Sequence, residues 1–433
     1  MHTALTKLSM KSSYILRDSG ARVVVASEDV RHVAATAAAA AGGVEHTILT
    51  SAAGQAPDDG GSGPTWDELL AAGAPYEPIE RDPDDVAALV YTSGTTGRSK
   101  GAMLSRGNLA ANQDQVLATP LAITEDDTVL GVLPLFHIYA MNVGLGASIR
   151  AGATILLVER FDPQRTLEDI ERHRVTVILG APPMYVAWLD TPGARERDLS
   201  SVRMAVSGAA PLPASVLNRF ADELGVPIWE GYGLTEASPA VTTNAMGEEI
   251  RPGSVGKPLP GVEVRLVDDR GRDVDLGDPG EVWVRGDNVF SGYWNDDAAT
   301  AEALVDGWLC TGDVGVFDED GYLRLVDRKR DLIIVSGFNV YPREVEEVLY
   351  RHPNIAEAAV IGVAHRYTGE AVKAVVVPRH GTELTEDDVL DHCRRSLARF
   401  KCPDIVVITD QLPHTSTGKV LRRLLRDAGE PVA

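Results

Sequence analysis

The chain has 433 residues, of which 44% are hydrophobic and 24% are charged, and its formal net charge is −22. This length exceeds the size at which a single hydrophobic core keeps growing, so we expect at least two domains. The acidic excess argues against a nucleic-acid or anionic-membrane partner, because both select basic surfaces. An anionic ligand must therefore be held by local donor groups or by a metal ion.

The cysteines and the N-terminal residues give no sign of a metal motif or of a targeting segment. Cys310, Cys393 and Cys402 form no CxxC pair and no Cys/His cluster. No apolar run approaches the ~18 residues of a membrane span, and MHTALTKLSMKSS lacks the apolar core of a signal peptide. We therefore expect a soluble, cytoplasmic protein.

The first half of the chain has the pattern of an α/β protein. SYILRDSGARVVVASEDV indicates the end of a helix, a turn at Gly20 and a buried strand over residues 23–26. An alanine-rich helix and a polar loop over residues 55–65 follow. From Val86 onward, short β-branched runs alternate with helical patterns, which favours parallel sheets with helices on their faces.

The second half of the chain changes texture twice. Short strands with tight turns over residues 253–328 predict a β-rich subdomain of hairpins. Residues 329–433 have the pattern of a small α+β domain, with one helix beginning at Pro342 and another capped by Thr385 and Asp388. The sequence therefore predicts an α/β protein with a large domain over residues 1–328 and a small domain over residues 329–433.

One segment, YTSGTTGRSKGAML over residues 91–104, is rich in glycine and hydroxyl groups. It is not a Walker A loop, because Ser99 and Gly101 stand where a glycine and a hydroxyl residue are needed, and Thr96 breaks the dinucleotide fingerprint. A loop of this composition after a strand can turn N–H and hydroxyl donors toward an anion. A solvated turn with an exposed lysine is the alternative.

Two other segments hold residues suited to nucleotide binding. EGYGLTEAS places Thr235 and Glu236 just past a strand, at the sheet edge where open α/β folds bind ligands, and a carboxylate there can hold Mg²⁺ on phosphates. CTGDVGVF places Asp313 in a turn where a carboxylate can accept sugar hydroxyls, with Arg328 nearby in VDRKRD. Each of these residues, taken alone, also fits an ordinary surface position.

Seven short segments occur in one order along the chain: YTSGTTGRSKG, SGAAPL, EGYGLTE, TGD, VDRKRD, SGFNVYPREVE and TSTGK. From about Val86 to Arg423 the chain thus resembles the adenylate-forming superfamily of acyl-CoA synthetases, luciferases and adenylation domains, and looks closest to fatty-acid CoA ligases. The resemblance implies a mobile C-terminal domain, and joining of a carboxylate to AMP from ATP with loss of pyrophosphate. The acyl group would then pass to CoA.

The resemblance also implies roles for individual residues. The β- and γ-phosphates of ATP would be wrapped by Thr92, Ser93, Gly94, Thr95, Thr96, Gly97 and Lys100. Adenine would lie against Tyr232, its neighbours Gly231 and Gly233, and the backbone of Gly208, Ala209 and Ala210. Asp313 and Arg328 would hold the ribose.

The reacting groups would be held by a further set of residues. Thr235 would bind the α-phosphate, Glu236 a magnesium ion, and Lys419 both the carboxylate and the α-phosphate. His137 would stand at the wall of the acyl pocket. Arg330 would be the hinge residue between the domains, and Gly337 would lie against the pantetheine arm of CoA.

The pocket residues favour an apolar acid as substrate. His137 replaces the aspartate of amino-acid-activating relatives, and Gly231 replaces the arginine of malonate-activating relatives. The walls are expected to include Met141, Val143, Pro183, Met184 and Val186, which suit an apolar tail. A fatty acid is therefore the first expectation and an aryl acid the second.

Three further outcomes are consistent with the sequence. The protein could deliver acyl-AMP to a carrier protein instead of CoA, it could be an inactive relative, and it could form a homodimer. Superfamily members carry a further N-terminal segment ahead of the part that matches YILRDSGARVVVA, so we expect the large domain to lack part of a sheet. Ser99, Arg330 and His414 also depart from the superfamily's usual residues.

Overall fold

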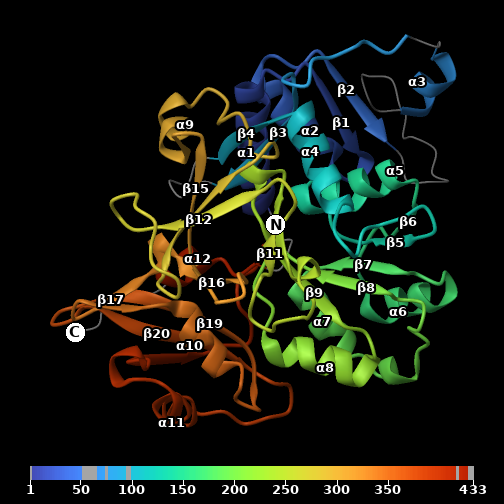
Figure 1. The fold of residues 1–433 in the computed structure, drawn as a ribbon. Helices are drawn as coiled ribbons and strands as arrows, with labels where there is room; N and C mark the ends of the chain where they lie inside the picture. Colours follow the sequence, from blue (N-terminus) through green and yellow to red (C-terminus); the bar gives the residue numbers. More distant parts are fainter. Residues whose placement is uncertain (1, 51–65, 74–76, 94–98, 416–418, 428–433) are drawn as a thin grey trace. The chain divides into compact units, whose positions relative to one another are not determined.

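The structure, a computed structural model, describes residues 2–50, 66–73, 77–93, 99–415 and 419–427 (Figure 1). The expected loop over residues 55–65 lies outside these ranges. The chain divides into two compact units, Met1–Arg106 with Ser291–Ala301, and Gly107–Phe290 with Glu302–Ala433. The two units are described separately below.

The first unit begins with a βαβ arrangement. Helix α1 (His2–Ser19) ends at Gly20, whose φ of 66° permits the turn, and β1 (Val23–Ser27), α2 (Arg31–Ala41) and β2 (His46–Thr50) follow. Strands β1 and β2 pair in parallel. The expectation of a buried β1 is wrong, since Val23 and Val25 are 50% and 53% exposed. Residues 23, 25 and 27 are exposed and alternate with partly buried residues, so one face of β1 has no covering element among the described residues.

The glycine-rich segment lies in a hairpin of the same unit. After α3 (Trp66–Ala72), strand β3 (Val86–Ser93) pairs antiparallel with β4 (Ser99–Ser105), and Thr92 faces Lys100. The expectation that VAALVYTS belongs to a parallel sheet is therefore wrong. The connection over residues 94–98 is too short for a parallel crossover, which needs a dozen or more residues. The returning segment Ser291–Ala301 brings Tyr293 beside Ala102 and contains most of α9 (Asp297–Ala303).

The second unit contains a seven-stranded sheet in the order β11-β10-β9-β8-β7-β5-β6, in which β6, β5, β7, β8 and β9 run parallel. This arrangement confirms the predicted parallel sheet. Its strands are β5 (Thr128–Gly131), β6 (Thr154–Leu157), β7 (Val177–Gly180), β8 (Met204–Ser207), β9 (Ile228–Gly233), β10 (Ala240–Thr243) and β11 (Lys257–Pro258). The helices are α4 (Arg106–Leu117), η2 (Tyr139–Gly146), α5 (Ala147–Ala151), α6 (Pro163–Arg172), α7 (Pro182–Leu189) and α8 (Ala214–Leu224).

Each face of this sheet is covered by its own helices. Ile178 and its counterparts on neighbouring strands pack against α6, α7 and α8 on one face, which Figure 1 draws in green. Leu179, one residue later, packs with η2 and α4 on the other face. Successive side chains of a strand point to opposite faces, so the buried run VILG supplies both cores.

A five-stranded antiparallel sheet follows, as the hairpin pattern predicted. Its strands are β12 (Glu263–Val267), β13 (Gly280–Arg285), β14 (Leu304–Val305), β15 (Trp308–Phe317) and β16 (Leu323–Arg328). Strands β15 and β16 pair in a register that places Asp313 opposite Arg328. Asp313 and Arg328, which come from two different motifs of the sequence, therefore lie side by side.

The C-terminal part of the same unit is an α+β arrangement. It contains β17 (Ile333–Val335), β18 (Phe338–Val340), α10 (Pro342–Leu349), β19 (Ile355–His365), β20 (Gly369–Pro378), α11 (Glu386–Ser396), β21 (Ile405–Ile408) and α12 (Arg422–Asp427). The predicted cap is confirmed, because Thr385 and Asp388 form a capping box at the start of α11. None of the helices in the described ranges has the length and apolarity needed to cross a membrane.

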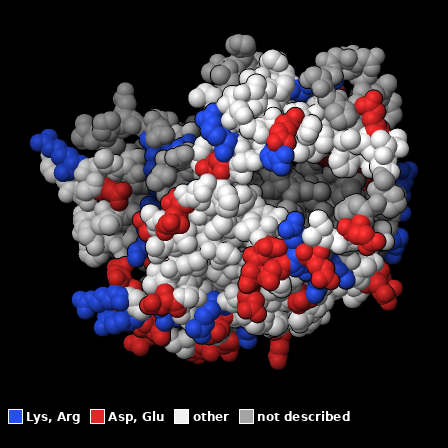
Figure 2. Space-filling model, turned by 90° about the horizontal axis from the view of Figure 1, so that it is seen from above, with Lys and Arg blue, Asp and Glu red and all other residues white. Residues whose placement is uncertain are grey.

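Charges on the surface are mixed. On the face drawn in Figure 2, acidic and basic side chains of the described residues are interspersed. Arg197, for example, pairs with both Glu168 and Glu171 at 2.9 and 3.1 Å. Ion pairs of this kind neutralise charge locally and leave the formal net charge of −22 unchanged.

Candidate functional site

The predicted phosphate loop is described only at its two ends. Thr92 and Lys100 face each other across the β3–β4 hairpin, and Lys100 Nζ lies 5.1 Å from the centroid of the Tyr293 ring. Gly94, Thr95, Thr96 and Gly97 lie outside the described residues, as does the side chain of Ser93. The hairpin gives the loop two anchored ends, and its contact with phosphate stays a prediction.

The clearest constellation in the second unit joins Tyr232, Asp313 and Arg328. The Tyr232 hydroxyl donates to Asp313 Oδ2 at 2.6 Å, and Arg328 Nε lies 3.0 Å from Asp313 Oδ1. Burial, followed by the charge of Asp313, raises the pKa of the Tyr232 hydroxyl, which therefore remains a donor. Asp313 is only 6% exposed. The structure thus presents a buried, oriented carboxylate beside an aromatic ring.

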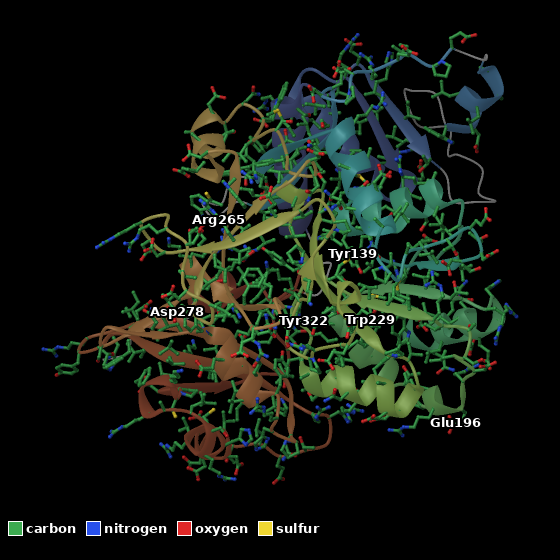
Figure 3. The ribbon with its side chains drawn as sticks, in the orientation of Figure 1. Tyr139, Glu196, Trp229, Arg265, Asp278 and Tyr322 are labelled. Atoms are coloured by element: carbon green, nitrogen blue, oxygen red, sulfur yellow. The ribbon has the colours of Figure 1, made fainter. Side chains whose placement is uncertain are left out.

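The loop after β8 packs against a tyrosine that the sequence analysis did not single out. The backbone N–H of Gly208 bonds to the oxygen of Gly180 at 3.1 Å, and Ala209 has a φ of 69°. A Cβ at Gly208 would lie 3.1 Å from the ring of Tyr139, whose hydroxyl bonds to the oxygen of Val206 at 3.2 Å (Figure 3). Tyr139 stands two residues after His137, and this closeness to a predicted site residue is the signal by which the sequence could have indicated it.

His137 and Lys419 are 282 positions apart along the chain and interact in the structure. The Nδ1 atom of His137 accepts the N–H of Tyr139 at 3.4 Å. Burial lowers the pKa of His137, and the positive charge of Lys419 lowers it further. The structure therefore brings the C-terminal lysine to the segment predicted to form the acyl pocket.

Lys419 is held by its own backbone. Its N–H donates to Thr415 Oγ1 at 3.1 Å, and its carbonyl accepts the N–H of Thr415 at 2.8 Å. Protein atoms crowd around the ammonium group although solvent still reaches the residue, and this desolvation lowers the pKa of Lys419 to about 8. The charges of Arg328 and Arg330 act in the same direction, while Asp313 opposes them. Lys419 thus lies within electrostatic reach of the Asp313–Arg328 pair.

Thr235 and Glu236 follow β9 directly, in the 3₁₀ turn Thr235–Ala237. The carbonyl of Glu236 accepts the N–H of Phe290 at 2.9 Å, which fixes the turn. The carboxylate of Asp313 and, less strongly, that of Glu236 raise the pKa of Arg328. No cluster of three metal-ligating side chains occurs among the described residues. A single carboxylate fits Mg²⁺, which proteins often hold through one or two carboxylates and substrate phosphates.

The two glycines that flank Tyr232 are required by sheet packing. A Cβ at Gly233 would lie 2.1 Å from the oxygen of Pro239, and one at Gly231 would lie 3.2 Å from the oxygen of Thr242. Thr242 lies on β10, the strand that pairs with β9, and Pro239 directly precedes it. A side chain at Gly233 would therefore displace the backbone there. The glycine at position 231 therefore has a packing reason besides the absence of a polar contact for substrate.

The predicted hinge and pantetheine residues both lie in turns. Arg330 is exposed in the 3₁₀ turn Lys329–Asp331, which follows β16. Gly337 is exposed between β17 and β18 with a φ of 84°, and nothing lies within 4 Å of a Cβ added there. A side chain at Gly337 would be restrained by the backbone conformation, not by a neighbour.

Two family models match the chain. Residues 10–294 match the family model of the AMP-binding enzymes, and residues 344–419 match that of the AMP-binding enzyme C-terminal domain. The chain belongs to the AMP-binding enzyme family. The resemblance predicted from the seven ordered segments is thereby confirmed.

Relatives of this family member include ligases for several acids. The chain is 45% identical over 346 residues to a long-chain-fatty-acid–CoA ligase of Yersinia pestis, a match that covers 79% of this chain and 61% of that protein. It is 42% identical over 418 residues to a feruloyl-CoA synthase of Amycolatopsis, covering 95% of this chain and 80% of the relative. The chain therefore spans less than two thirds of the length of the fatty-acid ligase.

Solved structures of the family share the fold. ATP-bound MatB from Rhodopseudomonas palustris superposes with a TM-score of 0.87 at 36% sequence identity, over 96% of this chain and 80% of that one. The predicted α/β fold class is confirmed by this likeness and by the sheets described above.

Proposed function

We propose that this protein is an ATP-dependent acyl-CoA ligase that converts a carboxylic acid to acyl-AMP with release of pyrophosphate and then to the CoA thioester. The observation that carries the proposal is the convergence of Tyr232, Asp313, Arg328, Lys419 and His137 in one unit. The long-chain-fatty-acid–CoA ligases and the feruloyl-CoA synthase among its relatives support it.

The proposed roles follow from the geometry. The buried Asp313 carboxylate would accept the ribose hydroxyls, and Tyr232 would present its ring to adenine. An oxygen of the substrate carboxylate attacks the α-phosphorus and pyrophosphate leaves, so two anions must be aligned and their charge neutralised. Lys419 would supply a cation at that point, and Thr235 a hydroxyl donor. Glu236 would hold a magnesium ion, whose charge offsets that of the phosphates.

The substrate proposal is an apolar acid, with a fatty acid first. A small apolar pocket, open to solvent, lies between η2 and strands β5, β6 and β7 of the sheet. Its lining comprises Val129, Leu130, Gly131, Leu133, Leu135, Ala140, Gly144, Leu145, Ile155, Leu157 and Leu179. Among the walls expected from sequence, Val143 and Met184 are instead buried in the separate cores of the two sheet faces. Leu135, which lines the pocket, stands two residues before His137 in the sequence.

An aryl acid is the second candidate, because the feruloyl-CoA synthase matches 95% of this chain. Transfer to a carrier protein and an inactive chain remain the other outcomes. CoA as acyl acceptor, movement of residues 329–433 as a lid about Arg330, a homodimer and a cytoplasmic location stay predictions.

An exchange assay separates these outcomes. Wild-type protein, ATP, Mg²⁺ and a panel of fatty and aryl acids would be tested for incorporation of labelled pyrophosphate into ATP, and for thioester formation with CoA. Exchange with fatty acids and thioester formation would support the proposal, and exchange without thioester would indicate another acceptor. We expect Lys419→Ala to abolish exchange while leaving thiolation of supplied acyl-AMP largely intact. Absence of exchange with every acid would contradict the proposed function.

A further inference from the structure

Arg422 lies three residues after Lys419, at the start of α12, and is the centre of an ion network. Its Nη2 atom lies 2.7 Å from each carboxylate oxygen of Glu346. Its Nη1 atom lies 3.5 Å from Asp327 Oδ1 and 3.5 Å from Asp331 Oδ2. One guanidinium group therefore binds three carboxylates, one from α10 and two from the continuous stretch of β16 and the turn after it.

Asp327 links this network to the ribose-binding pair. Its side chain is 3% exposed, its Oδ1 accepts the N–H of Arg328 at 2.7 Å, and its Oδ2 accepts the N–H of Arg343 at 3.0 Å. The residue precedes Arg328 on β16, ahead of the 3₁₀ turn Lys329–Asp331. Arg343 and Arg422 both follow that turn. The Asp327 carboxylate, which precedes the turn in the sequence, thus binds Arg343 and Arg422, which follow it.

The contacts of Arg422 differ in strength. The two-pronged contact with Glu346 at 2.7 Å joins groups that both follow the turn, and Glu346 also accepts the N–H of Val360 at 2.8 Å. The contact with Asp327 at 3.5 Å is longer and has one prong. Paired, two-pronged contacts between guanidinium and carboxylate are the stronger kind. Asp327 to Arg422 is therefore the weaker link of Arg422, and it crosses the turn, as do the contacts of Arg343 with Asp327 and with the oxygen of Leu325.

We propose that Arg422 is a positioning residue for acyl-AMP formation: it holds Lys419 beside the Asp313–Arg328 pair through Asp327. The inference rests on the proposed function, since it assigns Lys419 to the first half-reaction alone.

Two single-turnover assays test the kinetic part. Asp327→Asn removes the charge that attracts Arg422 and keeps one acceptor oxygen for the two N–H groups, of Arg328 and Arg343, that the carboxylate accepts. Arg422→Gln removes the other partner and leaves both N–H groups their acceptors. We expect each variant to slow acyl-AMP formation on the order of 10²-fold, as for a displaced reacting group, and to leave thiolation of supplied acyl-AMP unchanged. Arg423→Gln, with the same loss of charge on the exposed side of α12, should leave both steps unchanged.

The double variant separates positioning from general damage to the fold. If Asp327 and Arg422 act through one contact, Asp327→Asn combined with Arg422→Gln should be no slower in acyl-AMP formation than the slower single variant. Multiplying losses, equal losses in both half-reactions, or no loss would overturn the proposal. Arg422→Lys provides a second variant that keeps the charge and should recover part of the rate.

A labelling experiment tests the positioning independently of activity. Amine acylation of Lys419, followed by mass spectrometry over a range of pH, reports how strongly its surroundings favour the neutral amine. Asp327→Asn leaves in place the cations that lower the pKa of Lys419, so reduced labelling of this variant at a fixed pH near 8 reports displacement of Lys419, and Arg423→Gln should label as the wild type does. Unchanged labelling in Asp327→Asn would refute the positioning role, whereas an inactive wild type with the expected labelling shift would refute only the proposed function.

Discussion

Glu230 provides a direct test of how a buried carboxyl group on strand β9 is accommodated. The residue lies on β9, two positions before Tyr232, and is 2% exposed. Its Oε1 accepts the N–H of Leu212 at 3.4 Å, and its Oε2 has no hydrogen-bond partner among the described residues. Burial raises the pKa of Glu230 to about 7, although Arg343 opposes the shift. A carboxyl group in this state favours its proton.

The sign and size of the effect follow from the shift. A folded-state pKa above the ordinary value of 4.5 means that Glu230 contributes stability which is fully present below pH 4.5 and is lost as the pH rises through 7. Each pH unit of difference between the two states corresponds to about 1.4 kcal/mol. Between about pH 5 and about pH 8.5 the loss amounts to about 2 to 3 kcal/mol.

The substitution Glu230→Gln should remove this pH dependence. The amide is neutral, has almost the same shape, and keeps an oxygen for the N–H of Leu212. Its unpaired amide group carries a cost of its own, but that cost does not change with pH. The variant should therefore gain stability relative to the wild type as the pH rises, by about 2 to 3 kcal/mol in total between about pH 5 and about pH 8.5.

Thermal melting of both proteins at a series of pH values measures this difference. For a protein of this size the relative shift in melting temperature should be about 2 to 3 °C. Glu248→Gln, a change at an exposed acid, is the matched control and should follow the wild type at every pH. The reasoning is refuted if the difference between wild type and Glu230→Gln is the same at both ends of the pH range.

Three further predictions concern the two half-reactions. Acyl-AMP formation by the wild type should fall as the pH rises through about 8, because only about one tenth of Lys419 stays protonated one pH unit above its pKa. Lys419→Arg should lack this fall, since arginine keeps its charge. Identical pH profiles of the two proteins in single-turnover assays would contradict the role of Lys419 as a cation in this step. Gly337→Leu should slow thiolation more than adenylation. Gly337→Asn, whose side chain is smaller and tolerates a φ of 84°, should separate the effect of bulk from that of backbone strain. Equal CoA turnover in the wild type and both variants would refute a contact between Gly337 and the pantetheine arm. Lys100→Ala and Thr95→Ala should slow adenylation and spare thiolation, and equal losses in both would exclude a pyrophosphate clamp.

The sequence by itself determined the local elements and the family. Runs such as VTVILG and GEVWVRG became strands because β-branched residues suit a pleated, buried surface, and Thr385 with Asp388 began a helix because the two groups satisfy each other's backbone donors. The seven ordered segments were enough to identify the AMP-binding enzyme family. These features depend on neighbouring residues, which a sequence displays directly.

Only the tertiary structure decided which distant groups meet. Asp327 and Arg422 are 95 positions apart and Tyr232 and Asp313 are 81 apart, so no local period connects them. The antiparallel pairing of β3 depended on its partner strand, and the exposure of β1 on which of its faces another element covers, rather than on their own residues. Val143 and Met184 separated into two cores because a sheet has two faces, and the order of its strands sets which helix covers each one.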